Sequence, residues 1–423
     1  MIERPAATGA VLEYVPRWVD AYAKELFAEL PALELTGPRA AGKSTMARRL
    51  ATSVVQLDEP AQAALFRADP DAALLTLPEP ILLDEWQEAP EVLGAVKRAV
   101  DRYPRPGRFL LTGSVRADLT AATWPATGRV VRLSMFGLSM NERLRRGMDL
   151  PLLERLAAAE PMAEAPLPPT VPDLPGYIDM ALQSGFPEPA LRLSARARTA
   201  WLAAYLEQLF SRDAEALLDL RDPARLRKYF EALSADTTGL ASHHTLYEAA
   251  ELSRKTAMAY DHLLRNLFVV DAVPAWNDNN RLQRLVHSAK RYVVDAALAA
   301  AALRLDWASV LRDGSIFGRL LETFVVAQLR PWIEVSPLQP RLFHLRDKDG
   351  RHEVDLIVEV AQGIIGLEVK ATSAPRLDDA AGLLWLRDTL GPRFIAGAVL
   401  HTGPRPFQLA DRIGALPICT LWG

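Results

Sequence analysis

The sequence predicts an α/β protein with a parallel-sheet domain at its N-terminus. Short apolar segments of strand length alternate there with helical patterns, at 33–35, 53–57, 81–83 and 108–111. Such alternation favours a parallel sheet with helices on its faces. A glycine-rich loop joins the first strand to a helix. Near the C-terminus, polar and apolar residues alternate between turn residues over 341–370, which predicts a β-meander.

Each N-terminal element has its own sequence signal. Before the first strand, apolar residues recur at helical spacing over 18–30. The second strand ends at Asp58-Glu59-Pro60, and the helical pattern at 61–77 is broken at Pro70. A further helix at 92–103 precedes the strand that ends in Thr112-Gly113-Ser114.

The glycine-rich loop follows the pattern G-x-x-x-x-G-K-[ST]. Glycine lets the backbone curl so that several N–H groups point at one anion, and the following helix adds its positive end. Lys43 would reach the β- and γ-phosphates and Ser44 would hold Mg²⁺, although an ordinary glycine-rich turn is the alternative. We expect ATP to contact Gly37, Pro38, Arg39, Ala40, Ala41, Gly42, Lys43, Ser44 and Thr45.

The apolar strand at 81–83 ends in two carboxylates, Asp84 and Glu85. Many buried strands end in acids, so an acidic turn is one interpretation. Downstream of a phosphate loop, Asp84 is expected to hold the Mg²⁺ shell, and Glu85 to orient and deprotonate the attacking water.

Four stretches resemble the bacterial and archaeal family of AAA-like ATPases with a C-terminal domain of unknown function. They are LTGPRAAGKS, ILLDEWQEAP, GRFLLTGS and the segment from Gly128-Arg129 to Phe136-Gly137-Leu138-Ser139. The likeness covers nearly the whole chain. Ala40-Ala41 departs from it, because relatives often carry a larger polar residue and valine there; the change should not disturb phosphate binding.

This resemblance implies roles for three further residues. Thr112 or Ser114 would touch the γ-phosphate or the water, unless Ser114 only caps the next helix. Arg129 would serve as the finger for a neighbouring subunit's nucleotide, which requires a homo-oligomer. Its alternative is a surface arginine with a carboxylate partner.

Length and composition suggest how the chain is divided. Its 423 residues predict two to four domains: an ATPase domain at 1–150, a Pro/Ala-rich linker at 151–175, a helical and winged-helix domain at 176–300, and an α/β domain at 301–423. The 49 basic and 52 acidic residues nearly balance, so any nucleic-acid surface must be local. Cys419, the single cysteine, excludes disulfides within the chain and cysteine-based zinc sites. Without a signal core or a membrane-length apolar run, we expect a cytoplasmic protein with no membrane contact.

In the middle part, three short helical patterns are followed by two apolar segments, which describes a winged helix. Its third helix begins near Ser253, and in a DNA-binding version its N-terminal half would enter the major groove. The phosphate contacts would come from basic residues, chiefly Arg254, Lys255, Lys290 and Arg291, with Arg265, Arg281 and Arg284. The alternative is a structural adaptor with solvated basic residues.

The C-terminal part resembles the PD-(D/E)xK nuclease core. Glu322 lies in a predicted helix, and Asp355, Glu368 and Lys370 lie on neighbouring hairpin strands. In that core the acids hold a divalent ion, here Mg²⁺ or Mn²⁺, and the lysine helps to position the attacking water. The alternative is a nuclease-like unit kept for binding or structure, with an ion-paired relic of the site.

Together these patterns predict a Mg-ATP-dependent AAA-like ATPase that couples its nucleotide state to DNA binding or processing. The main alternative is a regulatory or signalling switch that acts on a protein partner, with the nuclease-like domain inactive. An assembly scaffold with slow turnover is a third interpretation.

Overall fold

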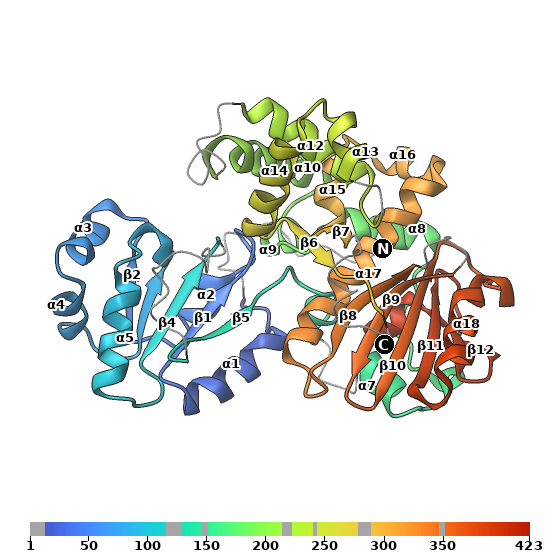
Figure 1. Ribbon diagram of the computed structural model, residues 1–423, viewed down its shortest axis with the longest axis horizontal. Coiled ribbons are helices and arrows are strands. Elements are labelled where there is room, and N and C mark those ends of the chain that lie inside the picture. The colour runs from blue at the N-terminus through green and yellow to red at the C-terminus, as the bar shows by residue number, and fades with distance from the viewer. Residues whose placement is uncertain are drawn as a thin grey trace.

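The computed structural model describes residues 13–115, 128–145, 151–213, 222–239, 243–277, 289–346 and 352–423. Figure 1 shows three regions: the N-terminal sheet and its helices at the left, a group of helices at the top, and the C-terminal sheet at the lower right. Within the described ranges, no helix combines the length and the apolar character needed to cross a bilayer.

The N-terminal region is a parallel sheet, as the sequence predicts. Its strand order is β2-β3-β4-β1-β5, and every pair is parallel. The carboxyl ends of all its strands therefore lie at one edge. The strands are β1 (Ala32–Thr36), β2 (Ser53–Gln56), β3 (Ile81–Asp84), β4 (Phe109–Gly113) and β5 (Val131–Ser134).

Helices cover both faces of this sheet because its strands are apolar on both sides. One buried cluster joins Leu33 and Leu35 to α1 and α2, and a second joins Ala32 to the helices of the other face. Asp69 caps α4 and ends α3, so the break expected at Pro70 is present. The helices are α1 (Trp18–Glu29), α2 (Lys43–Ala47), α3 (Pro60–Ala68), α4 (Pro70–Leu75) and α5 (Val92–Arg102).

The second strand of the middle region, at 290–293, lies beyond the two apolar segments from which the sequence predicts a wing. The region contains three helices and a two-stranded antiparallel sheet. These are α12 (Pro223–Ala235), α13 (His243–Ala249), α14 (Arg254–Asn266), β6 (Val270–Val273) and β7 (Lys290–Val293). The helices that precede and follow them are α8 (Leu174–Leu182), α9 (Pro187–Leu191), α10 (Ala195–Gln208), α15 (Ala296–Ala302) and α16 (Trp307–Arg312).

The C-terminal region is a mixed sheet of order β12-β13-β11-β10-β9-β8. The predicted meander is present as β8, β9 and β10, whereas β11 runs parallel to β10 and to β13. The last strand, β13, is an inner strand of this sheet, and residues 418–421 after it form a 3₁₀ turn. The elements are α17 (Gly314–Val335), β8 (Arg341–Arg346), β9 (Glu353–Val360), β10 (Gly363–Lys370), α18 (Ala381–Leu390), β11 (Phe394–His401), β12 (Phe407–Ala410) and β13 (Ile413–Pro417).

Residues 151–175 are not the exposed linker that their prolines suggest. They form α7 (Leu152–Ala157) and a 3₁₀ turn at Met162–Glu164, which pack against β11 and β13. Their apolar side chains are buried, namely Leu152, Leu153, Leu156 and Met162. Proline limits where helices begin and end, but burial is decided by these apolar side chains.

The middle and C-terminal regions share one hydrophobic core. A single buried cluster extends from Met140 to Trp422 and includes Tyr229 of α12 and Ile365 of β10. Cys419 is buried in it. Helix α17 contacts α1, α8, α15 and β10, and so lies between the regions (Figure 1). Residues from the predicted units 176–300 and 301–423 are therefore packed around one core.

Candidate functional site

The phosphate-loop sequence forms a tight curl between β1 and α2. Gly37, Ala40 and Gly42 all have positive φ, at 147°, 60° and 100°. A Cβ atom added to Gly37 would lie 2.0 Å from the carbonyl oxygen of Met135. Only glycine fits that position, since a side chain would meet the backbone that follows β5.

Lys43 lies inside this curl and is buried. Its Nζ donates to the carbonyl oxygens of Gly37 and Pro38, at 2.9 and 2.8 Å. Burial lowers the pKa of Lys43 to about 8, against the opposing charge of Glu85. The two carbonyl oxygens that hold the ammonium are weaker hydrogen-bond acceptors than phosphate oxygens. Lys43 can therefore exchange them for an anionic ligand.

Ser44 and Asp84 meet at the carboxyl edge of the sheet. The Ser44 hydroxyl donates to Oδ1 of Asp84 at 2.6 Å, and the Thr112 hydroxyl donates to the same oxygen. Arg48 donates to the other carboxylate oxygen at 3.3 Å. A hydroxyl and a carboxylate beside a phosphate loop are hard oxygen ligands, and they fit Mg²⁺.

Glu85 has a left-handed backbone conformation, with φ 54° and ψ 53°. Its N–H donates to the Thr112 hydroxyl at 3.1 Å, and its Oε2 accepts from Ser114 at 2.8 Å. The amide of Gln87 donates to the same Oε2. The structure therefore brings Glu85, Thr112 and Ser114 together, and the Ser114 side chain contacts Glu85.

Sequence reasoning missed Gln87 and Arg48. Gln87 follows Glu85 in the 3₁₀ turn Trp86–Glu88, so its position in ILLDEWQEAP was the available signal. Arg48 is the residue that follows α2, and its guanidinium donates to Asp84 at the end of β3. No pattern in the sequence distinguishes Arg48 from an ordinary surface arginine.

Arg129 lies at the opposite edge of the sheet. It precedes β5, which runs parallel to β1, whereas the phosphate loop follows β1. Its Nε donates to Oδ1 of Asp101 at 2.9 Å, and both side chains are about two-fifths exposed (42% and 38%). Arg129 cannot reach the loop of its own subunit, and its role for a neighbour stays a prediction.

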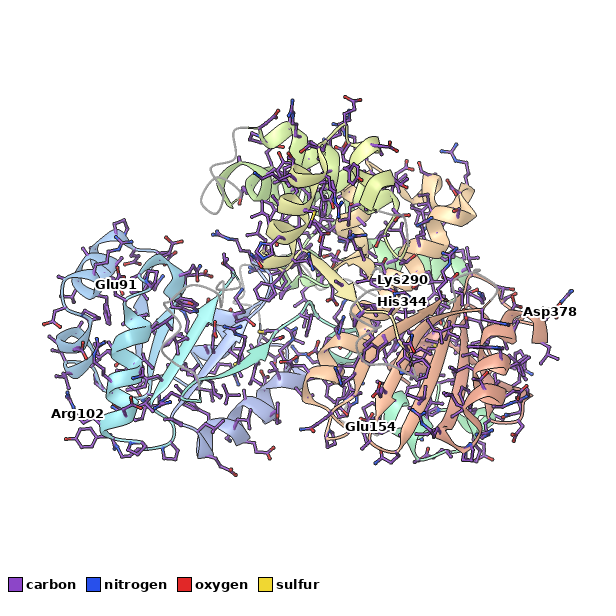
Figure 2. The ribbon with its side chains drawn as sticks, viewed as in Figure 1. Glu91, Arg102, Glu154, Lys290, His344 and Asp378 are labelled. Atoms are coloured by element: carbon purple, nitrogen blue, oxygen red, sulfur yellow. The ribbon has the colours of Figure 1, made fainter. Side chains whose placement is uncertain are left out.

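The C-terminal acids also converge, but around a lysine. Nζ of Lys290 lies 2.6 Å from Oε1 of Glu322 and 3.1 Å from Oδ1 of Asp355. The Tyr292 hydroxyl donates to the same Glu322 oxygen at 2.6 Å. Figure 2 labels Lys290 where the middle region meets the C-terminal sheet.

The remaining members of this cluster lie on β10. Lys370 is paired with Glu368, with Nζ and Oε2 3.3 Å apart. The N–H of Val369 donates to Oδ2 of Asp355 at 3.0 Å. We call Glu322, Asp355, Glu368, Lys290 and Lys370 the carboxylate cluster.

The positive charge of Lys290 in the carboxylate cluster weakens the expectation that the cluster binds a second divalent ion. Burial raises the pKa of Glu322 to about 7, and the charge of Asp355 adds to this effect while Lys290 opposes it. Although burial opposes it, the two carboxylates raise the pKa of Lys290, which stays charged. The ammonium of Lys290 thus lies between the carboxylates of Glu322 and Asp355 and neutralises part of their charge. In the described parts of the chain, no group of three or more His, Cys, Asp or Glu side chains is arranged to hold a metal ion.

The prediction is wrong for two of the seven basic residues expected to contact nucleic acid. Lys290 and Arg291 are buried, at 2% and 6% exposed, and Arg291 donates to Oδ1 of Asp261 at 3.0 Å. The carboxylates that pair with Lys290 and Arg291 lie far away in the sequence. The basic character of these two residues therefore does not predict whether they are exposed. Arg254 and Lys255 are exposed at the start of α14, whereas Arg281 and Arg284 lie outside the described residues.

Family models match three separate parts of the chain. An AAA domain model matches residues 30–144. A domain of unknown function (DUF8612) matches residues 175–309, and another (DUF4143) matches residues 317–421.

Among similar proteins are uncharacterized protein Mb2031c of Mycobacterium bovis and uncharacterized protein Rv2008c of Mycobacterium tuberculosis. Each is 28% identical over 395 residues, which cover 92% of this chain and 80% of the relative. Of the solved structures, the Walker-type ATPase PABY2304 of Pyrococcus abyssi is 15% identical over 68% of this chain and 94% of its own, with a TM-score of 0.40. Protein VC1899 from Vibrio cholerae is 12% identical over 92% and 95%, with a TM-score of 0.21. Residues 30–144 of this chain therefore match an AAA domain, and they are followed by two regions that match domains whose family descriptions name no function.

Proposed function

We propose that the protein binds Mg-ATP at residues 37–45 and hydrolyses it to ADP and phosphate. One hydrogen-bonded network supports this most directly, because it joins the groups that phosphoryl transfer needs at the carboxyl edge of the sheet. It runs from Ser44 to Asp84, and through Thr112 to Glu85 and Ser114. Its members come from α2 and from the ends of β3 and β4, beside the buried Lys43.

Each side chain in the network has a distinct task. Mg²⁺ bound with ATP neutralises charge on the β- and γ-phosphate oxygens. Ser44 and Asp84 would hold this ion, and Lys43 would exchange two backbone carbonyls for phosphate oxygens. Glu85 would accept a proton from the attacking water, since Ser114 and Gln87 already hold its Oε2.

Glu85→Gln tests this assignment, with Glu88→Gln as the matched control. Glu88 lies three residues further on and is exposed. Release of phosphate from Mg-ATP should fall at least 100-fold in Glu85→Gln, because an amide cannot take the proton, while the affinity for ATP stays within threefold. Glu88→Gln should hydrolyse ATP like the unchanged protein. Equal turnover by all three proteins would make the general-base assignment wrong.

The carboxylate cluster favours a role as a nucleotide-dependent switch over DNA cleavage. The acids resemble those of a PD-(D/E)xK core, yet Lys290 already pairs with two of them. In this second candidate function, ATP binding changes how the regions pack, and the C-terminal domain binds its target without cutting it. Supercoiled plasmid incubated with Mg²⁺ or Mn²⁺ should stay intact, and nicking that is lost in Asp355→Ala would contradict this.

Two kinds of partner belong to the same proposal. Arg254 and Lys255, exposed at the start of α14, would contact DNA phosphates. Arg129, on the outer edge of the ATPase sheet, would complete the nucleotide site of a second copy of the chain. A protein target in place of DNA is the alternative, and salt-dependent DNA affinity separates the two.

A further inference from the structure

Arg17 connects three segments that are distant in the sequence. It precedes α1, is 7% exposed, and uses all three guanidinium nitrogens. Nη1 donates to the carbonyl oxygen of Ala41 at 3.0 Å, and Nη2 to that of Phe136 at 2.7 Å. Nε donates to Oε1 of Glu142 at 3.1 Å. One buried side chain thus joins the phosphate loop to the segment 136–142.

The bond to Ala41 bears directly on phosphate binding. In a trans peptide the C=O and the N–H of one unit point in opposite directions. Arg17 holds the carbonyl of Ala41, so the N–H of Gly42 in the same peptide unit points away from Arg17. A hydrogen bond from a cation at the carbonyl also polarises that unit and strengthens its N–H as a donor. Arg17 therefore orients one of the loop donors before an anion arrives.

Glu142 keeps the guanidinium in place. It lies in α6 (Met140–Arg143) and is 5% exposed. Its Oε1 also accepts from the N–H of Trp18 at 2.9 Å, and its Oε2 accepts from the N–H of Ser139 at 2.8 Å. A buried ion pair is costly unless further hydrogen bonds satisfy its atoms, as they do here, and it then permits little movement.

The segment 136–142 is itself packed against the middle region. The N–H of Leu138 donates to the carbonyl oxygen of Gly185 at 2.6 Å. A Cβ atom on Gly137 would lie 3.1 Å from the carbonyl carbon of Gly185. The N–H of Gly185 donates at 2.6 Å to Asp295, which caps α15. The backbones are in direct contact, so a shift of 136–142 must move residue 185.

The middle region also approaches the phosphate loop directly. A Cβ atom on Gly42 would lie 3.8 Å from Cγ of Pro187 and 3.7 Å from Nη1 of Arg17. Pro187 opens α9, two residues after Gly185. The loop is therefore bounded by Arg17 and by Pro187, a residue of the middle region.

From these contacts we infer that Arg17 is a positioning residue for ATP binding and transmits the state of the phosphate loop to residues 184–187. The inference depends on the proposed ATP binding and adds the path by which that site acts on the middle region. Arg17 acts through the Ala41–Gly42 peptide unit and through Glu142 and segment 136–142. It takes no part in the chemical step.

Arg17→Met and Arg17→Lys test the positioning role, with Arg102→Met as the matched control. Arg102 is exposed on α5, far from the loop (Figure 2). Arg17→Met should raise KM and the Kd for Mg-ATP at least tenfold and leave kcat within threefold, because the donor serves ground state and transition state alike. Arg17→Lys should recover part of the affinity. An Arg17→Met protein with unchanged Kd and KM would overturn the positioning role.

Hydrogen exchange at Gly185 and Phe186 tests the transmission. In the unchanged protein, ATP should alter exchange at these amides, and in Arg17→Met at saturating ATP this change should be lost. Gly185→Ala is the second variant, since its methyl group would press on the carbonyl oxygen of Leu138 at 3.1 Å while Arg17 stays in place. It should bind ATP within threefold of the unchanged protein and lose the exchange response. Responses like that of the unchanged protein in both variants would overturn the transmission. Absence of ATP binding by the unchanged protein would overturn the proposed function as well.

Discussion

Lys290 and Glu322 form an ion pair in the interior, with Nζ and Oε1 2.6 Å apart. Lys290 is on β7 of the middle region and Glu322 is on α17. The pair therefore fastens the two-stranded sheet to the helix that lies between the regions. The sequence suggests that Lys290 contacts nucleic acid, whereas in the fold its ammonium pairs with buried carboxylates.

Lys290→Met should destabilise the protein by about 3–5 kcal/mol, because it leaves buried carboxylates without their cation. Urea denaturation measures this loss. Lys255→Met, on the exposed start of α14, is the control and should change stability by less than about 0.5 kcal/mol. Lys290→Met combined with Glu322→Gln should recover part of the loss. A loss below about 1 kcal/mol in the single variant would mean that the ion pair is not needed for stability.

ATP affinity should depend on pH through Lys43, whose burial lowers its pKa to about 8. Below this pH the ammonium is charged and ready for phosphate. Above it, binding must take up a proton, so Kd should rise about fivefold between pH 8 and pH 9. Titration with a fluorescent ATP analogue across pH 6.5–9 measures the trend. Lys43→Ala should bind weakly at every pH, whereas an unchanged slope in that variant would assign the titration to another group.

Arg129 should complete the site of a neighbouring subunit. Its partner Asp101 is an exposed carboxylate, so exchanging it for a nucleotide phosphate costs little. Arg129→Ala and Glu85→Gln should each be inactive alone, and mixing them should restore part of the phosphate release, since one mixed interface has both residues intact. Arg105→Ala, the control, changes an exposed arginine that pairs with Glu79, and this variant should stay active. Full activity of a protein that sediments as a monomer would contradict action in trans.

Arg254→Ala with Lys255→Ala should weaken DNA binding and its salt dependence. Each phosphate contact lowers the slope of log K against log salt by about 0.9, so losing two contacts should reduce it by about two. Fluorescence anisotropy with duplex and single-stranded DNA between 50 and about 200 mM salt measures both quantities. Arg102→Ala with Arg105→Ala, two exposed arginines of the N-terminal region, is the control. Equal slopes for both double variants would show that α14 does not contact DNA, and this result would favour a protein target.

The parts of the fold that the sequence predicts correctly depend on neighbours along the chain. The loop at 37–44 needs glycines at set positions, and the strand that ends at Asp84 needs an apolar run followed by an acid. The meander at 341–370 likewise follows from alternation and turn residues. Because local geometry sets these patterns, they can be read without knowing what packs against them.

Other features of the fold depend on contacts between segments that are far apart in the sequence. Lys290 and Arg291 are basic residues near a predicted wing, yet their partners Glu322, Asp355 and Asp261 bury them. Arg17 carries no motif, and its importance depends on Ala41, Phe136 and Glu142.

The sequence by itself determined the phosphate loop, the acid at the end of its neighbouring strand and the order of most elements. Tertiary structure decided which charges are exposed, that 151–175 packs on the sheet, and which lysine neutralises the C-terminal acids. The physical reason is that a charged side chain is stable either in water or beside an opposite charge in the interior. Which of the two applies depends on residues brought together from distant parts of the chain.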